Sequence, residues 1–137
     1  MYPEHITKPC EEQLTNAGFK ALKTPEEVTE ILAEKEGTTL LVINSVCGCA
    51  AGSARPGVIK SVDGDKKPAK LYTVFAGQDL EAVAKAREFT APYPPSSPSV
   101  ALFKNGELVH FIERHQIEGR PAEMIAANLQ GAYAEFC

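Results

Sequence analysis

The sequence predicts an α/β protein with a mixed central β-sheet, helices on both faces and a helical extension at the N-terminus. Short apolar runs rich in β-branched residues alternate with segments of helical periodicity up to residue 89. The turn signal Asn105-Gly106 then separates two further apolar runs, and a last helical segment follows. A strand–helix–strand unit followed by a hairpin and a helix gives a mixed sheet covered on both faces.

The predicted elements have recognisable start and stop signals. Thr24-Pro25-Glu26-Glu27 forms a capping box with proline at the first helical position, and Asp79 is expected to cap a later helix. Pro56 lies inside a predicted helix and should kink it, because proline has no N–H to donate. The predicted helices cover residues 4–17, 25–36, 50–60, 80–89 and 121–137, and the predicted strands cover 40–43, 71–75, 100–103 and 108–112.

Length and composition indicate one soluble globular domain covering residues 1–137. The chain is 44% hydrophobic and 23% charged, its formal net charge is −4, and no basic patch suggests a nucleic-acid partner. The sequence shows neither an apolar run long enough to span a membrane nor the hydrophobic core of a signal peptide. We therefore expect a cytoplasmic protein without nucleic-acid or membrane partners, in which four cysteines do not form a disulfide framework.

The most informative stretch is Cys47-Gly48-Cys49, which lies between a predicted buried strand and a predicted helix. The unpaired N–H groups and the positive end of the dipole at a helix start favour an anion. The pKa of the Cys47 thiol is therefore expected to fall below the ~8.5 of a free thiol.

The spacing of the two cysteines favours redox chemistry. Cα atoms two residues apart are at most ~7 Å from each other, so a bend in the chain brings them into disulfide range. A disulfide that closes so small a ring should be strained and easily reduced, which is typical of catalytic disulfides. Gly48 supports the motif, since glycine adopts conformations closed to other residues and places no side chain beside the sulfurs.

The segment from Ser97-Pro98 to Asn105-Gly106 resembles the part of thioredoxin-like proteins in which a cis-proline precedes a hairpin. Pro98 takes the cis-proline position, and the resemblance implies a thioredoxin-like fold. Thioredoxins carry two residues between their active cysteines, whereas this chain carries only Gly48.

A closer resemblance, covering nearly the whole chain, is to the bacilliredoxin family. The residues that carry it are 42–52 with Ala54-Arg55-Pro56, then 73–79, 93–98 and 113–119. The resemblance implies a thiol–disulfide oxidoreductase that reduces mixed disulfides between bacillithiol and protein cysteines. It implies no bound cofactor, bacillithiol as the thiol co-substrate and bacillithiolated proteins as partners. Cys47 would attack and take the small thiol, and Cys49 would resolve or tune the exchange.

Ser97 and Pro98 are candidate substrate-binding residues. A cis peptide bond at Pro98 would place the backbone of Ser97 beside the cysteines, where it can pair in strand fashion with an extended substrate segment. Arg114 and His115 follow the predicted hairpin and are expected to be surface or loop-anchoring groups.

Other functions stay open. A general protein disulfide reductase or isomerase would use the same cysteines, and a strained, relatively oxidising disulfide favours isomerase chemistry. A metal-binding or redox-sensing module is a further alternative, although structural zinc prefers four ligands. The remaining candidate ligands are scattered singly along the chain; they are Cys10, Cys137, His110 and His115. In the simplest alternative, the close pair is two small buried hydrophobic side chains.

Overall fold

The computed structural model describes residues 2–137, and in that part of the chain five strands form one mixed β-sheet. The strand order is β1-β3-β2-β4-β5; β2 runs parallel to β3 and β3 to β1, while β4 is antiparallel to both of its neighbours. The strands are β1 (Lys20–Ala21), β2 (Thr38–Asn44), β3 (Lys70–Phe75), β4 (Ser99–Lys104) and β5 (Glu107–Ile112). The predicted mixed sheet is confirmed.

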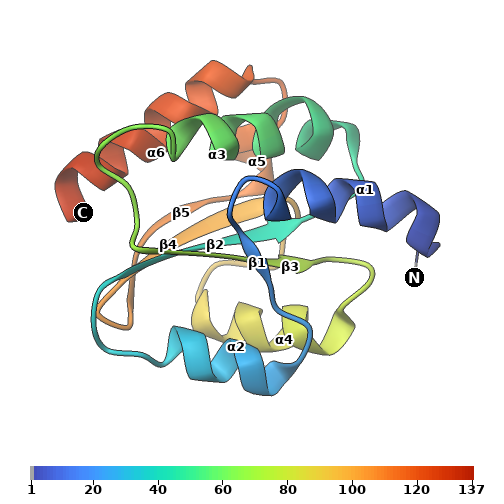
Figure 1. Cartoon of the computed structure of the whole chain (residues 1–137), viewed down its shortest axis with the longest axis horizontal. Helices are drawn as coiled ribbons and strands as arrows, with labels where there is room; N and C mark the ends of the chain where they lie inside the picture. The colour runs from blue at the N-terminus through green and yellow to red at the C-terminus, as the bar shows by residue number, and fades with distance from the viewer. Residues whose placement is uncertain (1) are drawn as a thin grey trace.

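Helices cover both faces of this sheet, as predicted (Figure 1). One face carries α1, α3, α5 and α6, and the other carries α2 and α4. The helices are α1 (Glu4–Thr15), α2 (Pro25–Leu32), α3 (Arg55–Ser61), α4 (Leu80–Phe89), α5 (Arg114–Ile117) and α6 (Ala122–Phe136).

Strand β2 is the centre of the core because both of its faces are buried. Leu40 and Val42 point into the cluster under α3 and α6, and Leu41 and Ile43 point into the cluster under α2 and α4. Successive side chains of a strand face opposite sides, so a strand buried on both sides needs a continuous apolar run. The continuous apolar run at residues 40–43 is therefore explained by the central position of β2 in the sheet.

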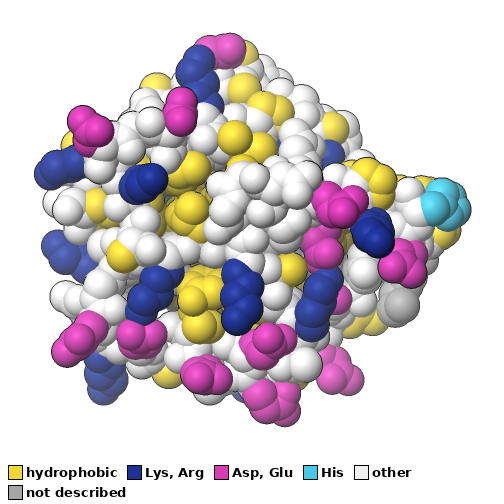
Figure 2. Space-filling view, viewed as in Figure 1, with side chains coloured by type: hydrophobic (Ala, Val, Ile, Leu, Met, Phe, Trp, Pro, Cys, Tyr) yellow, Lys and Arg dark blue, Asp and Glu magenta, His cyan; other side chains and the backbone are white. Residues whose placement is uncertain are grey.

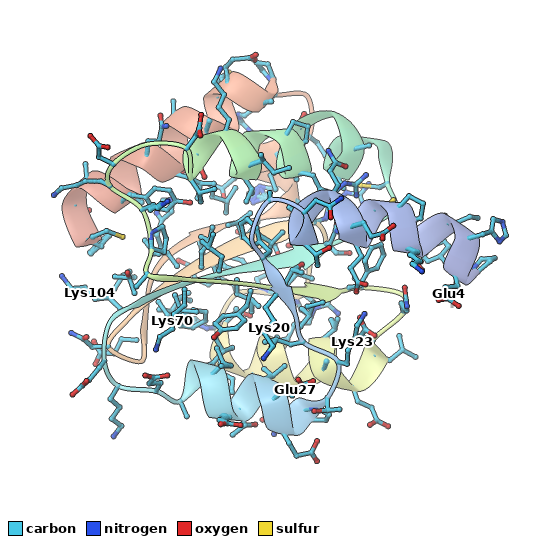
Figure 3. The ribbon with its side chains drawn as sticks, in the orientation of Figure 1. Glu4, Lys20, Lys23, Glu27, Lys70 and Lys104 are labelled. Carbon is cyan, nitrogen blue, oxygen red and sulfur yellow. The ribbon has the colours of Figure 1, made fainter. Side chains whose placement is uncertain are left out.

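The start of α2 has the predicted capping box. The Thr24 hydroxyl accepts a hydrogen bond from the Glu27 N–H at 3.2 Å, and the Glu27 carboxylate accepts one from the Thr24 N–H at 3.2 Å. The same carboxylate also accepts from the Lys23 N–H at 2.9 Å (Figure 3). The two reciprocal bonds satisfy N–H groups that a helix start leaves unpaired.

The prediction that Asp79 caps α4 is wrong. The Asp79 side chain makes no capping hydrogen bond, and its carboxylate instead lies 3.5 Å from the Lys23 ammonium. Lys23 also pairs with Glu11 and so connects α1 to the loop before α4. The ion pair with Lys23 therefore holds the carboxylate away from the N–H groups of α4.

Pro56 lies within the predicted helical segment at residues 50–60, and the kink predicted there stays a prediction. The proline lies in the first turn of α3, and a π-helical turn, η1 (Ala50–Ala54), precedes it. In that turn the Arg55 N–H donates to the Ala50 carbonyl, five residues earlier. A wider turn suits this position, because proline cannot supply the next donor of a regular helix.

The predicted hairpin turn is present, while two short elements were not predicted. Asn105 and Gly106 both have positive φ angles, 53° and 84°, as a tight turn between β4 and β5 requires. Strand β1 is two residues long and α5 four, which is too short to give a periodic pattern. Predicted helix ends also differ: α1 ends at Thr15 rather than 17, and α2 ends at Leu32 rather than 36.

The surface shown in Figure 2 carries lysines and arginines interspersed with aspartates and glutamates. This mixture agrees with the small formal net charge of −4. Within residues 2–137, none of the helices combines the length and the apolar character needed to cross a membrane.

Candidate functional site

Cys47 lies where β2 gives way to a helical turn, as the sequence predicts. Strand β2 ends at Asn44, and the Cys47 carbonyl accepts the first helical hydrogen bonds from the N–H groups of Ala50 and Ala51, at 3.1 and 3.2 Å. Both Cys47 and Cys49 are free, half-buried thiols packed against the core under α3 and α6. The prediction that this position needs the conformational freedom of glycine is wrong, because Gly48 has no positive φ angle and a Cβ atom on it would meet nothing within 4 Å beyond its chain neighbours.

The two thiols are electrostatically unequal. Burial raises the pKa of the Cys47 thiol, but hydrogen bonds to its thiolate outweigh burial and set the pKa below its ordinary value; the donors are the Cys49 thiol, the Ala50 N–H, the Ser45 hydroxyl and the Cys49 N–H. For Cys49, burial, the hydrogen bond to Cys47 and the Cys47 charge all raise the pKa. Cys47 is therefore the thiol of the pair that ionises more easily, and the thiolate is the nucleophilic form of a cysteine.

Pro98 lies at the same end of the central strands as the cysteines. The Ser97–Pro98 peptide bond is cis, as the resemblance to thioredoxin-like proteins implies. Ser99, which follows, opens β4 and pairs with Ile43 of β2, so the proline stands beside the end of the strand that leads to Cys47. The predicted contact of Ser97 and Pro98 with substrate stays a prediction.

Comparison with known proteins decides the family. The model of the family described as "Disulphide isomerase" matches residues 2–137. The chain is 62% identical to the bacilliredoxin of Cytophaga hutchinsonii over 136 residues, which cover 99% of this chain and 100% of that protein. It is 57% identical to a bacilliredoxin of Halalkalibacterium halodurans, with 99% and 94% of the two chains covered.

The chain belongs to the bacilliredoxin family. Solved thioredoxins share its fold: that of Malassezia sympodialis has a TM-score of 0.61 at 16% identity, with 87% of this chain and 90% of that chain covered. Reduced Schistosoma mansoni thioredoxin has a TM-score of 0.58 at 16% identity, with 87% and 98% covered. The family and the fold together make this protein a thiol–disulfide oxidoreductase.

A buried arginine, Arg55, supports the cysteine turn of this bacilliredoxin-family protein; the sequence marked it only as part of the family resemblance and gave no sign of its burial. Only 3% of Arg55 is exposed. Its guanidinium donates to the Ser45 carbonyl at 2.6 Å, to Asn44 Oδ1 at 3.0 Å and to Gln13 Oε1 at 2.8 Å. These acceptors are neutral oxygens from α1 and from the end of β2. The arginine thus ties the helix after the cysteines to the strand before them.

The bonds of Arg55 extend to Cys47 itself. Asn44 Oδ1 also accepts from the Ser45 N–H at 2.8 Å, and Ser45 Oγ accepts from the Cys47 N–H at 3.1 Å. The Ser45 hydroxyl can therefore donate its own hydrogen to the Cys47 thiolate, as its effect on the Cys47 pKa requires.

Arg114 is a second site residue whose part the sequence analysis underestimated. It anchors the proline loop, as expected, because its guanidinium donates to the Ser97 carbonyl at 3.2 Å. Its charge also lowers the pKa of Cys49, while the hydrogen bond to Glu118 and the charges of both thiols raise its own pKa. His115 is 69% exposed and pairs with Glu113 at 3.2 Å, so it remains a surface group.

The other cysteines stand apart from the pair. The Cys10 thiol donates to the Ile6 carbonyl at 3.4 Å within α1, while the Cys10 carbonyl accepts from the Asn44 amide at 3.1 Å. Cys137 is exposed after the end of α6. Among the described residues, no group of three or more histidine, cysteine, aspartate and glutamate side chains could hold a metal ion.

Proposed function

We propose that this protein reduces mixed disulfides between bacillithiol and protein cysteines in the cytoplasm, with Cys47 as the nucleophile and Cys49 as the second thiol. The observation that carries the proposal is the inequality of the two thiols: four donors, one of which is the Cys49 thiol, lower the pKa of Cys47, while the pKa of Cys49 is raised. Proteins that share up to 62% of the sequence and bear the name bacilliredoxin support the choice of small thiol.

The first step is an exchange at the sulfur of bacillithiol. The Cys47 thiolate attacks that sulfur, the bond between bacillithiol and the client sulfur breaks, and the client leaves as a thiolate. The product is a disulfide between Cys47 and bacillithiol, so the number of disulfides is unchanged. Exchange is fastest when the attacking thiol has a pKa near the ambient pH. Hydrogen bonds lower the pKa of Cys47 from its ordinary value, and burial partly offsets this decrease.

The second step removes bacillithiol from Cys47. In one route a second bacillithiol attacks the sulfur of the bound one, which frees Cys47 as a thiol and gives bacillithiol disulfide. In the other route the Cys49 thiolate attacks Cys47, which frees bacillithiol and leaves a Cys47–Cys49 disulfide that two further bacillithiol molecules reduce. The raised pKa of Cys49 keeps it protonated while Cys47 is a thiolate. Once Cys47 has reacted, its negative charge is gone and Cys49 ionises more easily. The pair therefore acts in a fixed order.

The client peptide needs an extended binding edge. We retain the proposal that Ser97 and Pro98 provide it, since both lie where β4 begins, beside the end of β2. Both cysteines are only half-buried, so an extended client segment can approach the two sulfurs from solvent.

A second candidate function is disulfide isomerisation, which the description of the matching family model favours. An isomerase would act on a protein with wrongly paired disulfides and would not accumulate a small-thiol adduct. The two functions therefore differ in their substrates and not in their cysteines.

The test compares two substrates under one assay. Initial rates are measured on a bacillithiolated client and on the same client with scrambled internal disulfides, using wild type, Cys47→Ser and Cys49→Ser. We expect faster release of client thiol from the bacillithiolated form, complete loss in Cys47→Ser, and turnover in Cys49→Ser when free bacillithiol is supplied. Preference for the scrambled client would establish the isomerase instead.

A further inference from the structure

Arg114 occupies a special position in the fold. It opens α5 directly after β5, and Val100 of β4 pairs with Ile112 near the end of β5. Because β4 begins beside the end of β2, Arg114 stands at the sheet edge that carries the cysteines and Pro98. Its side chain is 44% exposed. A cation thus faces solvent beside the two sulfurs.

The guanidinium is held in place by two partners. One N–H donates to the Ser97 carbonyl at 3.2 Å, and Nε–H donates to the Glu118 carboxylate at 2.8 Å. A guanidinium carries five N–H donors in a rigid fork that matches a carboxylate. Donors beyond the two used for Ser97 and Glu118 are therefore available to a ligand, and the bond to Ser97 fixes the orientation of the fork.

Glu118 shows that a carboxylate fits this arginine. Its side chain is 54% exposed, and the pair lies one helical turn apart at the surface. Exposed ion pairs of this kind contribute little stability, because water solvates both charges well. A carboxylate that arrives with a substrate can therefore replace Glu118, or share the fork with it, at small cost.

We propose that Arg114 is a specificity-determining residue that binds a carboxylate of the small thiol in the mixed disulfide. The inference rests on the proposed function: bacillithiol joins a cysteine to glucosamine and malate, and its malate end carries two carboxylates. When Cys47 attacks the sulfur of bacillithiol, the small thiol becomes attached at the site and its anionic end lies within reach of the arginine. Glu118 is the internal carboxylate that holds the fork ready in the free protein.

The arginine is also connected to the proposed client-binding residues. Its guanidinium donates to the carbonyl of Ser97, which together with Pro98 forms the proposed client-binding segment. The residue proposed to bind the small thiol therefore lies next to the segment proposed to bind the client chain.

The test uses one client protein with two different small thiols. One form carries bacillithiol and the other carries 2-mercaptoethanol, which is neutral and has no carboxylate. Values of kcat/KM are measured for wild type, Arg114→Gln, Arg114→Lys and Glu118→Gln, with His115→Gln as the matched control because its side chain is exposed and points to Glu113. Arg114 is also exposed, so these variants are expected to fold.

Arg114→Gln should lower kcat/KM on the bacillithiol form by about three- to tenfold and leave the 2-mercaptoethanol form within about twofold, since one partly exposed charge-assisted contact is lost. Arg114→Lys should restore part of the loss, and Glu118→Gln should lower KM for the bacillithiol form. His115→Gln should change neither substrate.

An equal loss on both substrates would overturn the inference, because a change in thiol ionisation alone acts on both alike. Unchanged kcat/KM in Arg114→Gln would also overturn it. Failure of wild type to act on the bacillithiol form, while it still acts on other disulfides, would instead contradict the proposed function.

Discussion

Cys47 and Cys49 have the same chemistry and are separated by one residue, yet their surroundings push their pKa values in opposite directions. The difference arises from donors. Cys47 faces the first N–H groups of a helical turn and the Ser45 hydroxyl, whereas Cys49 has the Cys47 charge beside it. The sequence predicts the lowered pKa of Cys47 because the helix start is readable in it. The raised pKa of Cys49 depends on side-chain positions, which spacing alone does not give.

The pH dependence of alkylation should reveal this difference. In a Cys10→Ser/Cys137→Ser background, the initial rates of iodoacetamide modification, read by peptide mass spectrometry before Cys47 is largely alkylated, should have a midpoint below that of a free thiol at Cys47 and above it at Cys49. Adding Ser45→Ala removes a donor to the thiolate, so the Cys47 midpoint should move to higher pH. Equal midpoints for the two cysteines would contradict the assignment of Cys47 as the thiolate.

Arg55 is the residue for which sequence reasoning failed. Arginine is rarely buried, and nothing in the run of small residues before it distinguishes a buried arginine from a surface one. Its burial follows from the acceptors that meet it, which come from α1 and from the end of β2. Residues 13, 44 and 55 converge only in the folded chain.

Arg55→Met should destabilise the fold and alter the site together. The substitution keeps much of the side-chain volume but removes the Arg55 donors to the Ser45 carbonyl and Gln13 Oε1 and one of the two donors to Asn44 Oδ1, at a cost of about 2–4 kcal/mol in the free energy of unfolding. Since Ser45 then loses its fixed position, the Cys47 midpoint should rise as well. Arg114→Met is the exposed control for stability. Loss of stability without any change at Cys47 would show that Arg55 is only structural.

At the scale of elements, the packing of α3 against α6 fixes the helix that follows the cysteines. Gly57 makes this contact possible: a Cβ there would lie 2.6 Å from Ile125 Cβ and 2.9 Å from the Ala122 carbonyl oxygen. Glycine inside a helix ordinarily weakens it relative to alanine. The structure shows Gly57 as a position where the two helices approach too closely for a side chain.

Gly57→Ala should therefore destabilise the protein in spite of the better helix propensity of alanine. We expect a loss of about 1–3 kcal/mol in the free energy of unfolding, measured by urea denaturation, because backbone and a branched side chain must move. Gly131→Ala in α6 is the matched control: its new Cβ meets nothing within 4 Å, so it should be neutral or stabilising by up to about 1 kcal/mol. Equal effects of the two substitutions would contradict the close-packing account.

The elements that could be predicted from the sequence are those with long periodic patterns or with clear start, stop or turn residues. The apolar run of β2, the capping box of α2 and the Asn105-Gly106 turn each have a local sequence pattern that is sufficient to predict their conformation. The two-residue β1, the four-residue α5 and the π-helical turn do not, because their conformations are set by neighbours in space. The Asp79 cap failed for the same reason, since Lys23 comes from a different part of the chain.

At the scale of the whole molecule, the sheet order brings the site together. The end of β2 supplies the cysteine turn, the start of β4 follows Pro98, and the end of β5 leads to Arg114. These three strands are neighbours and their pairing is antiparallel, so the three strand ends lie side by side. Residues 47, 98 and 114 become one site for this reason. The family resemblance pointed to the cysteines and the proline, and the sequence indicated Arg114 as a loop-anchoring group, while the effect of its charge on the two thiols became visible only in the folded chain.

The most direct measurement is intact-protein mass spectrometry of Cys49→Ser after mixing with a bacillithiolated client. The account predicts a bacillithiol adduct on Cys47 and a client with its thiol set free, because a serine hydroxyl at position 49 cannot displace the small thiol. The double variant Cys47→Ser/Cys49→Ser should show no adduct. A disulfide between Cys47 and the client protein, with bacillithiol released, would contradict the account and favour the reductase or isomerase.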